Sequence, residues 1–318
     1  MTPHTGLGHA VAKIILFGEH SVVYGYPAIA LPLRSLRMTA RAEPFDDPNR
    51  RTTLTSLGWS GPMTEAPAHF ASILRAVAVA TEFAGRPDAG IDISTHSEFP
   101  AQRGLGSSAA AAGAVIRAIL DAYDVPATPQ EIFHLTQEAE RIAHGRPSGL
   151  DAMATSANAP VHFQAGTTTE LDFALEAWIV IADSGIQGST RETVGNVRSL
   201  YETSPETTRA ALARLGSITE EAVDDLRAGN IAPVGAKMTQ AHGLLAGLGV
   251  SNAPLDALVA AALEAGALGA KLTGGGGGGC VIALASTREE AQRVEAALIA
   301  AGARATWLHA PSAGEVAA

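Results

Sequence analysis

A glycine-serine loop that runs directly into an alanine-rich stretch constrains this sequence more than any other feature. Gly104-Leu105-Gly106-Ser107-Ser108-Ala109-Ala110 is followed by mostly small apolar residues up to Tyr123, which predicts a loop opening into a buried helix. Glycines let the backbone approach a ligand closely, and the free N–H groups of a helix start favour a phosphate. A serine hydroxyl there can reach a magnesium ion on the phosphates. The motif is neither a Walker A loop nor a dinucleotide-binding fingerprint, and alone it leaves open a tight turn with a serine N-cap.

A second segment places two carboxylates around a helix break. Glu140 lies in the last turns of a helix predicted over residues 128–143. Gly145 and Pro147 end that helix, so that Asp151 can turn back toward the same site. Glu140 then suits magnesium as a hard oxygen ligand, and Asp151 can accept a proton from a hydroxyl. Taken alone, the two carboxylates are better interpreted as ordinary helix charges, Glu140 solvated and Asp151 at a helix N-terminus. Zinc is set aside because His144 and Glu140 have no third ligand at a fitting spacing.

The N-terminal segment places a lysine inside an apolar strand. Lys13 interrupts the run from Val11 to Phe17, and a buried lysine is costly unless a carboxylate or a phosphate pairs with it. Glu19 and His20 follow just past the predicted strand end, a typical place for binding residues. For His20 alone, a structural histidine is the favoured interpretation.

A glycine run near the C-terminus predicts a strand, a loop and a second strand. Lys271-Leu272-Thr273 precedes six glycines, Gly274 to Gly279, and then Cys280. Ordering six glycines loses much chain entropy, which calls for a reason such as close backbone approach to a polar ligand. A flexible hairpin is the alternative. Cys280 is predicted to be a buried strand residue, and as the one cysteine of the chain it excludes an internal disulfide and indicates a reducing compartment.

Composition and length limit the remaining classes of function. The 318 residues are 47% hydrophobic and 17% charged, which excludes a disordered chain. The net charge of −10 argues against broad nucleic-acid binding by charge, although a local site can still take an anion. No segment has the features of a signal peptide, and none is apolar and long enough to span a membrane. We therefore expect a cytoplasmic protein without a membrane partner.

The pattern along the chain predicts a strand-rich part followed by a helix-rich part. The change falls near residues 165–190, and we expect domains at 1–175 and 176–318. Strands are expected at residues 9–17, 34–42, 91–95, 161–163, 169–173, 178–182, 270–273, 281–285 and 303–309. Helices are expected at residues 68–83, 128–143 and 288–300, and around 212–226. The helix at 128–143 has a predicted capping box, with Thr128 before Pro129 and Glu131 three residues later.

Together these segments resemble the GHMP small-molecule kinases, in the family's order and over nearly the whole chain. The most specific part is Lys13-Ile14-Ile15-Leu16-Phe17-Gly18-Glu19-His20-Ser21-Val22-Val23-Tyr24-Gly25, which is similar to the branch of the family that acts on mevalonate. Galactokinases follow Gly-Glu-His with Thr-Asp, and phosphomevalonate kinases tend to show Gly-Glu-Tyr. Two positions depart from the family pattern. Gln102 stands where a glycine is usual, and Gly275 stands where an alanine is usual.

The resemblance implies an α+β fold of two domains with the active site in the cleft between them. It implies transfer of the γ-phosphate of ATP, with Mg²⁺, to the C5 hydroxyl of mevalonate. Asp151 matches the catalytic aspartate, and Lys13 matches the lysine that neutralises charge beside the nucleophile. Ser108 and Glu140 match the magnesium ligands. The matches to the phosphate loop are Gly104, Leu105, Gly106, Ser107, Ser108 and Ala109, and the matches to substrate contacts are Lys13, Glu19, His20, Ser148 and Asp151.

Three alternatives stay open at this point. The first is another GHMP kinase, acting on phosphomevalonate or on a sugar. The second is the related decarboxylase, whose opening motif around Asn-Ile-Lys-Tyr-Trp-Gly-Lys is absent here. The third is a catalytically silent ATP-binding sensor, which predicts the loss of Asp151, Lys13 or Glu140, although all three are present. The sequence does not set the oligomeric state, for which a homodimer is one option.

Overall fold

The computed structural model describes residues 3–47, 49–144, 148–171 and 173–310, and it contains two compact units. Unit 1 comprises Met1–Lys13, Pro32–Ala101 and Gly106–Ala157, and unit 2 comprises Ile14–Leu31, Gln102–Leu105 and Asn158–Ala318. Helices and strands occur in both units, so the predicted α+β class is confirmed. The predicted domain boundary at residue 175 stays a prediction.

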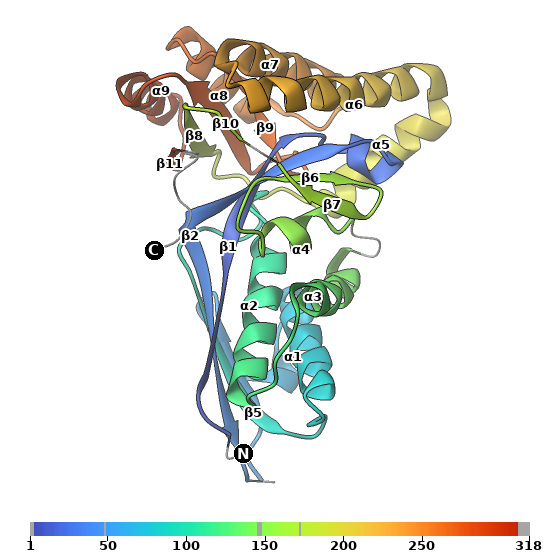
Figure 1. The fold of residues 1–318 in the computed structure, drawn as a ribbon, viewed down its shortest axis with the longest axis vertical. Coiled ribbons are helices and arrows are strands. Elements are labelled where there is room, and N and C mark those ends of the chain that lie inside the picture. The colour runs from blue at the N-terminus through green and yellow to red at the C-terminus, as the bar shows by residue number, and fades with distance from the viewer. Residues whose placement is uncertain (1–2, 48, 145–147, 172, 311–318) are drawn as a thin grey trace. The chain divides into compact units, whose positions relative to one another are not determined.

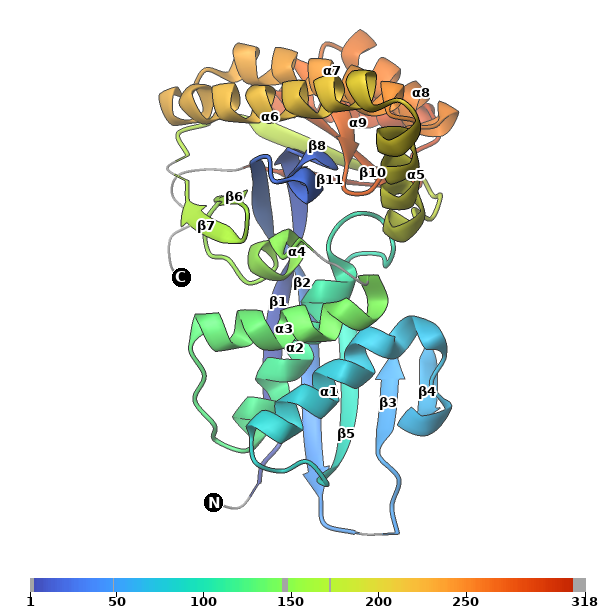
Figure 2. The ribbon, with the colours of Figure 1, turned by 90° about the vertical axis from the view of Figure 1, so that its right-hand side faces the viewer.

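Unit 1 packs three helices against antiparallel and parallel strands (Figure 2). Strand β2 pairs antiparallel with β5, from Met38 opposite Ser97 to Phe45 opposite Gly90, and β5 pairs parallel with β3. Strands β3 and β4 pair antiparallel as a hairpin. Strands β1 and β2 also contribute residues to unit 2. The strands are β1 (Gly6–Phe17), β2 (Ala28–Phe45), β3 (Thr53–Ser56), β4 (Trp59–Pro62) and β5 (Gly90–Ser97).

The helices of unit 1 follow the sequence signals closely. Helix α2 is almost entirely buried, as its alanine-rich sequence predicts. The capping box of α3 is confirmed: the backbone N–H and the hydroxyl of Thr128 donate to Glu131 Oε2 at 2.7 and 2.8 Å, and the N–H of Glu131 donates back at 3.2 Å. The helices are α1 (Ala71–Phe83), α2 (Ser107–Ala122), α3 (Pro129–His144) and α4 (Leu150–Ala154), with short 3-10 turns at Met63–Glu65 and Ala68–Phe70.

Unit 2 contains an antiparallel sheet in the order β11-β8-β10-β9, with α6 and α7 running side by side (Figure 1). The central strand β10 is completely buried, and Cys280 begins it, as predicted. The strands are β8 (Trp178–Asp183), β9 (Gly269–Thr273), β10 (Cys280–Ala285) and β11 (Ala305–His309). The helices are α5 (Thr190–Thr203), α6 (Pro205–Ala228), α7 (Ile231–Gly247), α8 (Ala253–Glu264) and α9 (Arg288–Ala300), and the 3-10 turn η1 spans Ser21–Tyr24.

Helix α7 satisfies the outer edge of strand β9. The N–H groups of Ala270 and Leu272 donate to Thr239 Oγ1 and to His242 Nδ1, each at 3.3 Å. Because Nδ1 accepts this bond, the ring proton sits on Nε2, which lies 3.1 Å from Asp256 Oδ1. Burial lowers the pKa of His242, in spite of the opposing effect of Asp256. Strand β9 is therefore held on both of its edges.

One predicted strand was placed too late in the chain. Strand β7 spans Thr167–Glu170 rather than residues 169–173, and it pairs with β6 (Val161–Gln164), which also pairs with the start of β2. Ala165 and Gly166, both at positive φ (48° and 84°), form a two-residue hairpin turn. The turn forces β7 to begin directly at Thr167. Among the helices of the described residues, none combines the length and the apolar character needed to cross a membrane.

Candidate active site

The central contact in unit 1 joins a buried lysine to a half-exposed aspartate. Lys13 Nζ lies 2.9 Å from Asp151 Oδ1, and the two side chains are 2% and 46% exposed. The N–H of Val11, two residues before Lys13 on β1, donates to the carbonyl of Thr155 at the end of α4 at 3.1 Å. This bond sets β1 against α4, so the lysine meets the aspartate. The cost of burying Lys13 is offset by the partner that its position in the sequence required.

Gly106 gives the phosphate loop its close approach to this ion pair. It is the N-cap of α2 with φ 76°, and a Cβ added there would lie 2.9 Å from both Lys13 Cγ and Thr155 Cγ2. Both the backbone conformation and the lack of space therefore call for glycine. The first turn of α2 thus begins beside the ammonium side chain, where its free N–H groups and the cation both favour an anion.

A second cluster gathers hydroxyls around a buried carboxylate. Glu140 of α3 is 2% exposed, and its Oε1 accepts hydrogen bonds from Ser108 of α2 at 2.7 Å and from Ser72 of α1 at 2.6 Å. Three helices that pack together in unit 1 each supply one of these residues. The resemblance had named Ser108 and Glu140 together as magnesium ligands, whereas Ser72 carries no motif by which it could have been found.

Gly104 of the phosphate loop and Gly274 of the C-terminal glycine run both belong to unit 2. A Cβ on Gly104 would lie 2.6 Å from the carbonyl of Thr273, and one on Gly274 would lie 2.7 Å from Gly104 Cα, so the two glycine loops touch backbone to backbone. Gln102 adopts φ 59°, a left-handed conformation at the position where the family has glycine. Arg103 is committed to a buried ion pair, with its Nε 2.9 Å from Asp183 Oδ1.

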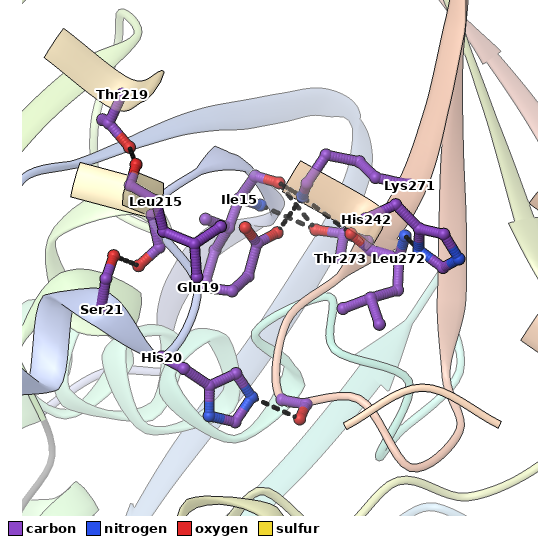
Figure 3. A network of polar contacts seen from close by, with 12 residues as sticks. Ile15, Glu19, His20, Ser21, Leu215, Thr219, His242, Lys271, Leu272 and Thr273 are labelled. Carbon is purple, nitrogen blue, oxygen red and sulfur yellow. Dashed lines mark hydrogen bonds and ion pairs between the residues drawn. The ribbon is translucent and has the colours of Figure 1, made fainter. Parts of the chain in front are cut away.

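Three links tie the end of β1 to strand β9 and to the glycine loop (Figure 3). Thr273 Oγ1 accepts from the N–H of Ile15 at 2.9 Å and donates to its carbonyl at 3.1 Å. Lys271 Nζ pairs with Glu19 Oε1. His20 Nε2 lies 2.8 Å from the carbonyl of Gly275. Because a carbonyl only accepts, Nε2 carries the ring proton, and burial lowers the pKa of His20, which keeps the ring neutral near pH 7.

The remaining predicted site residues differ in how exposed they are. Ser148 is exposed, and its Oγ accepts from the N–H of Leu150 at 3.3 Å. Leu105 and Ala109 are buried, and Ser107 is half-buried at the start of α2. Gly145 and Pro147, predicted to end α3, lie outside the described residues. Among the described residues there is no group of three or more His, Cys, Asp or Glu that could hold a metal ion.

Comparisons with known proteins identify the class of this chain. The model of the GHMP kinases N terminal domain matches residues 71–158, and the GHMP kinases C terminal model matches residues 222–304. The chain belongs to the GHMP kinase family. Its relatives include a mevalonate kinase of Thermococcus onnurineus, 37% identical over 93% of each chain, and one of Pyrococcus horikoshii, 37% identical over 89% of each chain. Among solved structures, a mevalonate kinase of L. major in complex with R-mevalonate has a TM-score of 0.83 at 25% identity, over 98% of both chains.

Proposed function

We propose that this chain transfers the γ-phosphate of ATP to the C5 hydroxyl of mevalonate, giving 5-phosphomevalonate and ADP. Kinases of the GHMP family use ATP as the phosphate donor. The observation that carries the proposal is the contact of 2.9 Å between Lys13 Nζ and Asp151 Oδ1, with the Lys13 side chain packed beside Gly106 of the phosphate loop. The relatives that are 37% identical to this chain are mevalonate kinases, which supports mevalonate as the phosphate acceptor.

Asp151 and Lys13 have different roles at the reacting hydroxyl. The Asp151 side chain is half-exposed, so its carboxylate can orient the hydroxyl and take its proton. Lys13 is buried and cannot turn away, which keeps a positive charge beside the oxygen as that oxygen gains negative charge. Phosphoryl transfer depends mainly on such positioning and charge stabilisation.

The cluster around Glu140 fits a magnesium ion. Its donors are the Glu140 carboxylate and the Ser108 hydroxyl, oxygen ligands that a hard cation prefers, and the two lie 2.7 Å apart in a largely buried place. We propose that these two residues bind Mg²⁺, with Ser72 orienting the carboxylate through its own hydrogen bond of 2.6 Å. When bound, the ion neutralises the charge of the ATP phosphates. The N–H groups of Gly104 to Ala109 are assigned to the same phosphates.

Substrate contacts are assigned to Glu19, His20 and Ser148. His20 donates from Nε2 to the carbonyl of Gly275, so its Nδ1 can only accept. That nitrogen suits the C3 hydroxyl of mevalonate, which donates, better than it suits the carboxylate. The exposed hydroxyl of Ser148 can donate to the carboxylate. Glu19 is held by Lys271 and is assigned to a hydroxyl of the substrate.

The cations near the matching segments argue against phosphomevalonate as the acceptor. Phosphomevalonate adds at least one negative charge at C5, where the γ-phosphate must approach. Arg103 is committed to Asp183, and Arg141 is exposed on α3. Arg146, the remaining cation of these segments, lies outside the described residues. We therefore propose that phosphomevalonate is rejected by a wide margin in kcat/KM.

An ADP-release assay with three acceptors tests this function. The pure protein is supplied with ATP, magnesium and either mevalonate, phosphomevalonate or galactose at equal concentrations. We expect ADP production that depends on mevalonate and is at least about 100-fold slower with the other two acceptors. Comparable rates with phosphomevalonate or galactose would replace the proposal with another kinase of the family, and ATP binding without turnover would favour the sensor.

A further inference from the structure

We propose that Lys271 is a positioning residue for this reaction, which holds the Glu19 carboxylate in place for the substrate without touching the substrate itself. The proposal rests on the proposed function, because Glu19 is assigned to the substrate there. Lys271 lies on β9 and Glu19 follows the end of β1, and both belong to unit 2. The two side chains are 0% and 1% exposed.

Three acceptors among the described residues surround the Lys271 ammonium. Nζ donates to Glu19 Oε1, to the carbonyl of Leu272 at 2.7 Å and to the carbonyl of Ile15 at 3.4 Å (Figure 3). A lysine ammonium has three hydrogens and accepts nothing. With three acceptors already in place, Lys271 has no hydrogen left for a ligand. Its effect on the reaction must therefore pass through the residues that it holds.

The two partners differ in how firmly the backbone fixes them. Lys271 sits in a strand that pairs with β10 on one side and donates to α7 on the other. Glu19 lies between Gly18 and His20, at φ 98° and 60°, in a turn outside any strand. Backbone bonds close this turn, from the N–H of Val22 to the carbonyl of Gly18 at 3.1 Å and from the N–H of Ser21 to the carbonyl of Glu19 at 2.6 Å, but no strand ladder extends over Glu19. Side-chain contacts therefore decide where the Glu19 carboxylate points. Strand β9 fixes the position of Lys271, and the ion pair with Lys271 in turn fixes the position of the Glu19 carboxylate.

Removing Lys271 leaves the buried Glu19 carboxylate without its cation. A buried carboxylate without its cation must move toward water, take up a proton or destabilise the fold. Each of the first two outcomes changes the group that is assigned to the substrate. The nucleotide is assigned to the phosphate loop and to Glu140, so its binding should change far less. We therefore expect the removal of Lys271 to weaken the binding of mevalonate selectively.

The first experiment compares Lys271→Met with a matched lysine variant. Lys237 of α7, the other lysine of unit 2, pairs with Asp225 at 2.7 Å, so Lys237→Met also removes a lysine ion pair. We expect Lys271→Met to raise KM for mevalonate on the order of tenfold or more and to change KM for ATP less than about twofold. Lys237→Met should leave both values unchanged. An unchanged KM for mevalonate, or equal rises in both KM values, would overturn the proposal.

A double variant keeps the test valid if Lys271→Met folds poorly. Glu19→Gln combined with Lys271→Met removes both charges together, and chemical unfolding should show it more stable than Lys271→Met. If Lys271 acts through Glu19, the added Lys271→Met change shifts KM for mevalonate less than about twofold from the Glu19→Gln value. A further large loss would refute that route. Failure of the proposed function appears separately, as a wild-type chain that does not turn over mevalonate.

Discussion

Replacing Asp151 with asparagine should abolish most turnover while leaving the fold intact. The amide has nearly the same shape as the carboxylate, but it carries no charge and cannot take the proton of the hydroxyl. At the 2.9 Å that separates Lys13 Nζ from Asp151 Oδ1, unit charges attract by about 1 kcal/mol in water and about 6 kcal/mol at an effective dielectric constant of 20. The aspartate is half-exposed and the lysine buried, so the attraction between the two charges lies between these limits.

A loss of about 100-fold in kcat corresponds to about 2.7 kcal/mol in activation free energy, which is typical of a general base. We therefore expect Asp151→Asn to lower kcat by a factor on the order of 100 or more, with a modest change in KM. ADP release at saturating ATP and mevalonate measures kcat, and chemical unfolding shows whether the variant is folded. Asp124→Asn removes an exposed carboxylate of the same unit and should behave as wild type. A folded Asp151→Asn variant with near-normal kcat would refute the catalytic role.

Three further predictions concern the metal, the glycine loop and pH. Glu140→Gln should raise the magnesium concentration needed for activity, because an amide is a poorer ligand, and high magnesium should partly restore the rate; an equal loss at all concentrations would contradict this role. Gly275→Ala should lower the free energy of unfolding by about 1 to 3 kcal/mol in urea, since a Cβ would lie 2.7 Å from Thr190 Oγ1; an unchanged midpoint would count against it. Burial lowers the pKa of His242 in the folded chain, so the unfolded chain takes up protons first, and stability should fall as pH drops below about 6.5. His242→Asn should make that fall smaller, and an undiminished fall would exclude this residue as a source.

Most of the contacts around Lys13 and Glu140 in unit 1 join residues that each had a signal in the sequence. Lys13 in an apolar strand required an anionic partner, and Asp151 meets it at 2.9 Å. Glu140 near the end of its helix and Ser108 at the start of another were both marked by loops beside them, and they meet at 2.7 Å. Ser72 was not predictable, because a serine in the first turn of α1 gives no sign of what it contacts.

For Lys271, the need for an anionic partner was predictable from the sequence, but the identity of that partner was not. A lysine inside the apolar strand before the glycine run also requires an anionic partner. Which anion it finds depends on a contact across 252 residues of sequence, and no local pattern encodes that distance. The start of β7 was misplaced because the two-residue turn at Ala165 and Gly166 sets where the strand begins, and that turn was not recognised from the sequence. Long-range pairing and turn geometry therefore limited the prediction.

The central claim is that the C5 hydroxyl of mevalonate attacks the γ-phosphorus of ATP. Mevalonate labelled with ¹⁸O at its C5 hydroxyl, incubated with the enzyme, ATP and magnesium, tests this directly by phosphorus NMR of the product. We expect 5-phosphomevalonate with the label in the bridging oxygen between C5 and phosphorus, together with one ADP for each phosphate ester. Release of ADP with inorganic phosphate and no ester, or an ester that lacks the label, would contradict it.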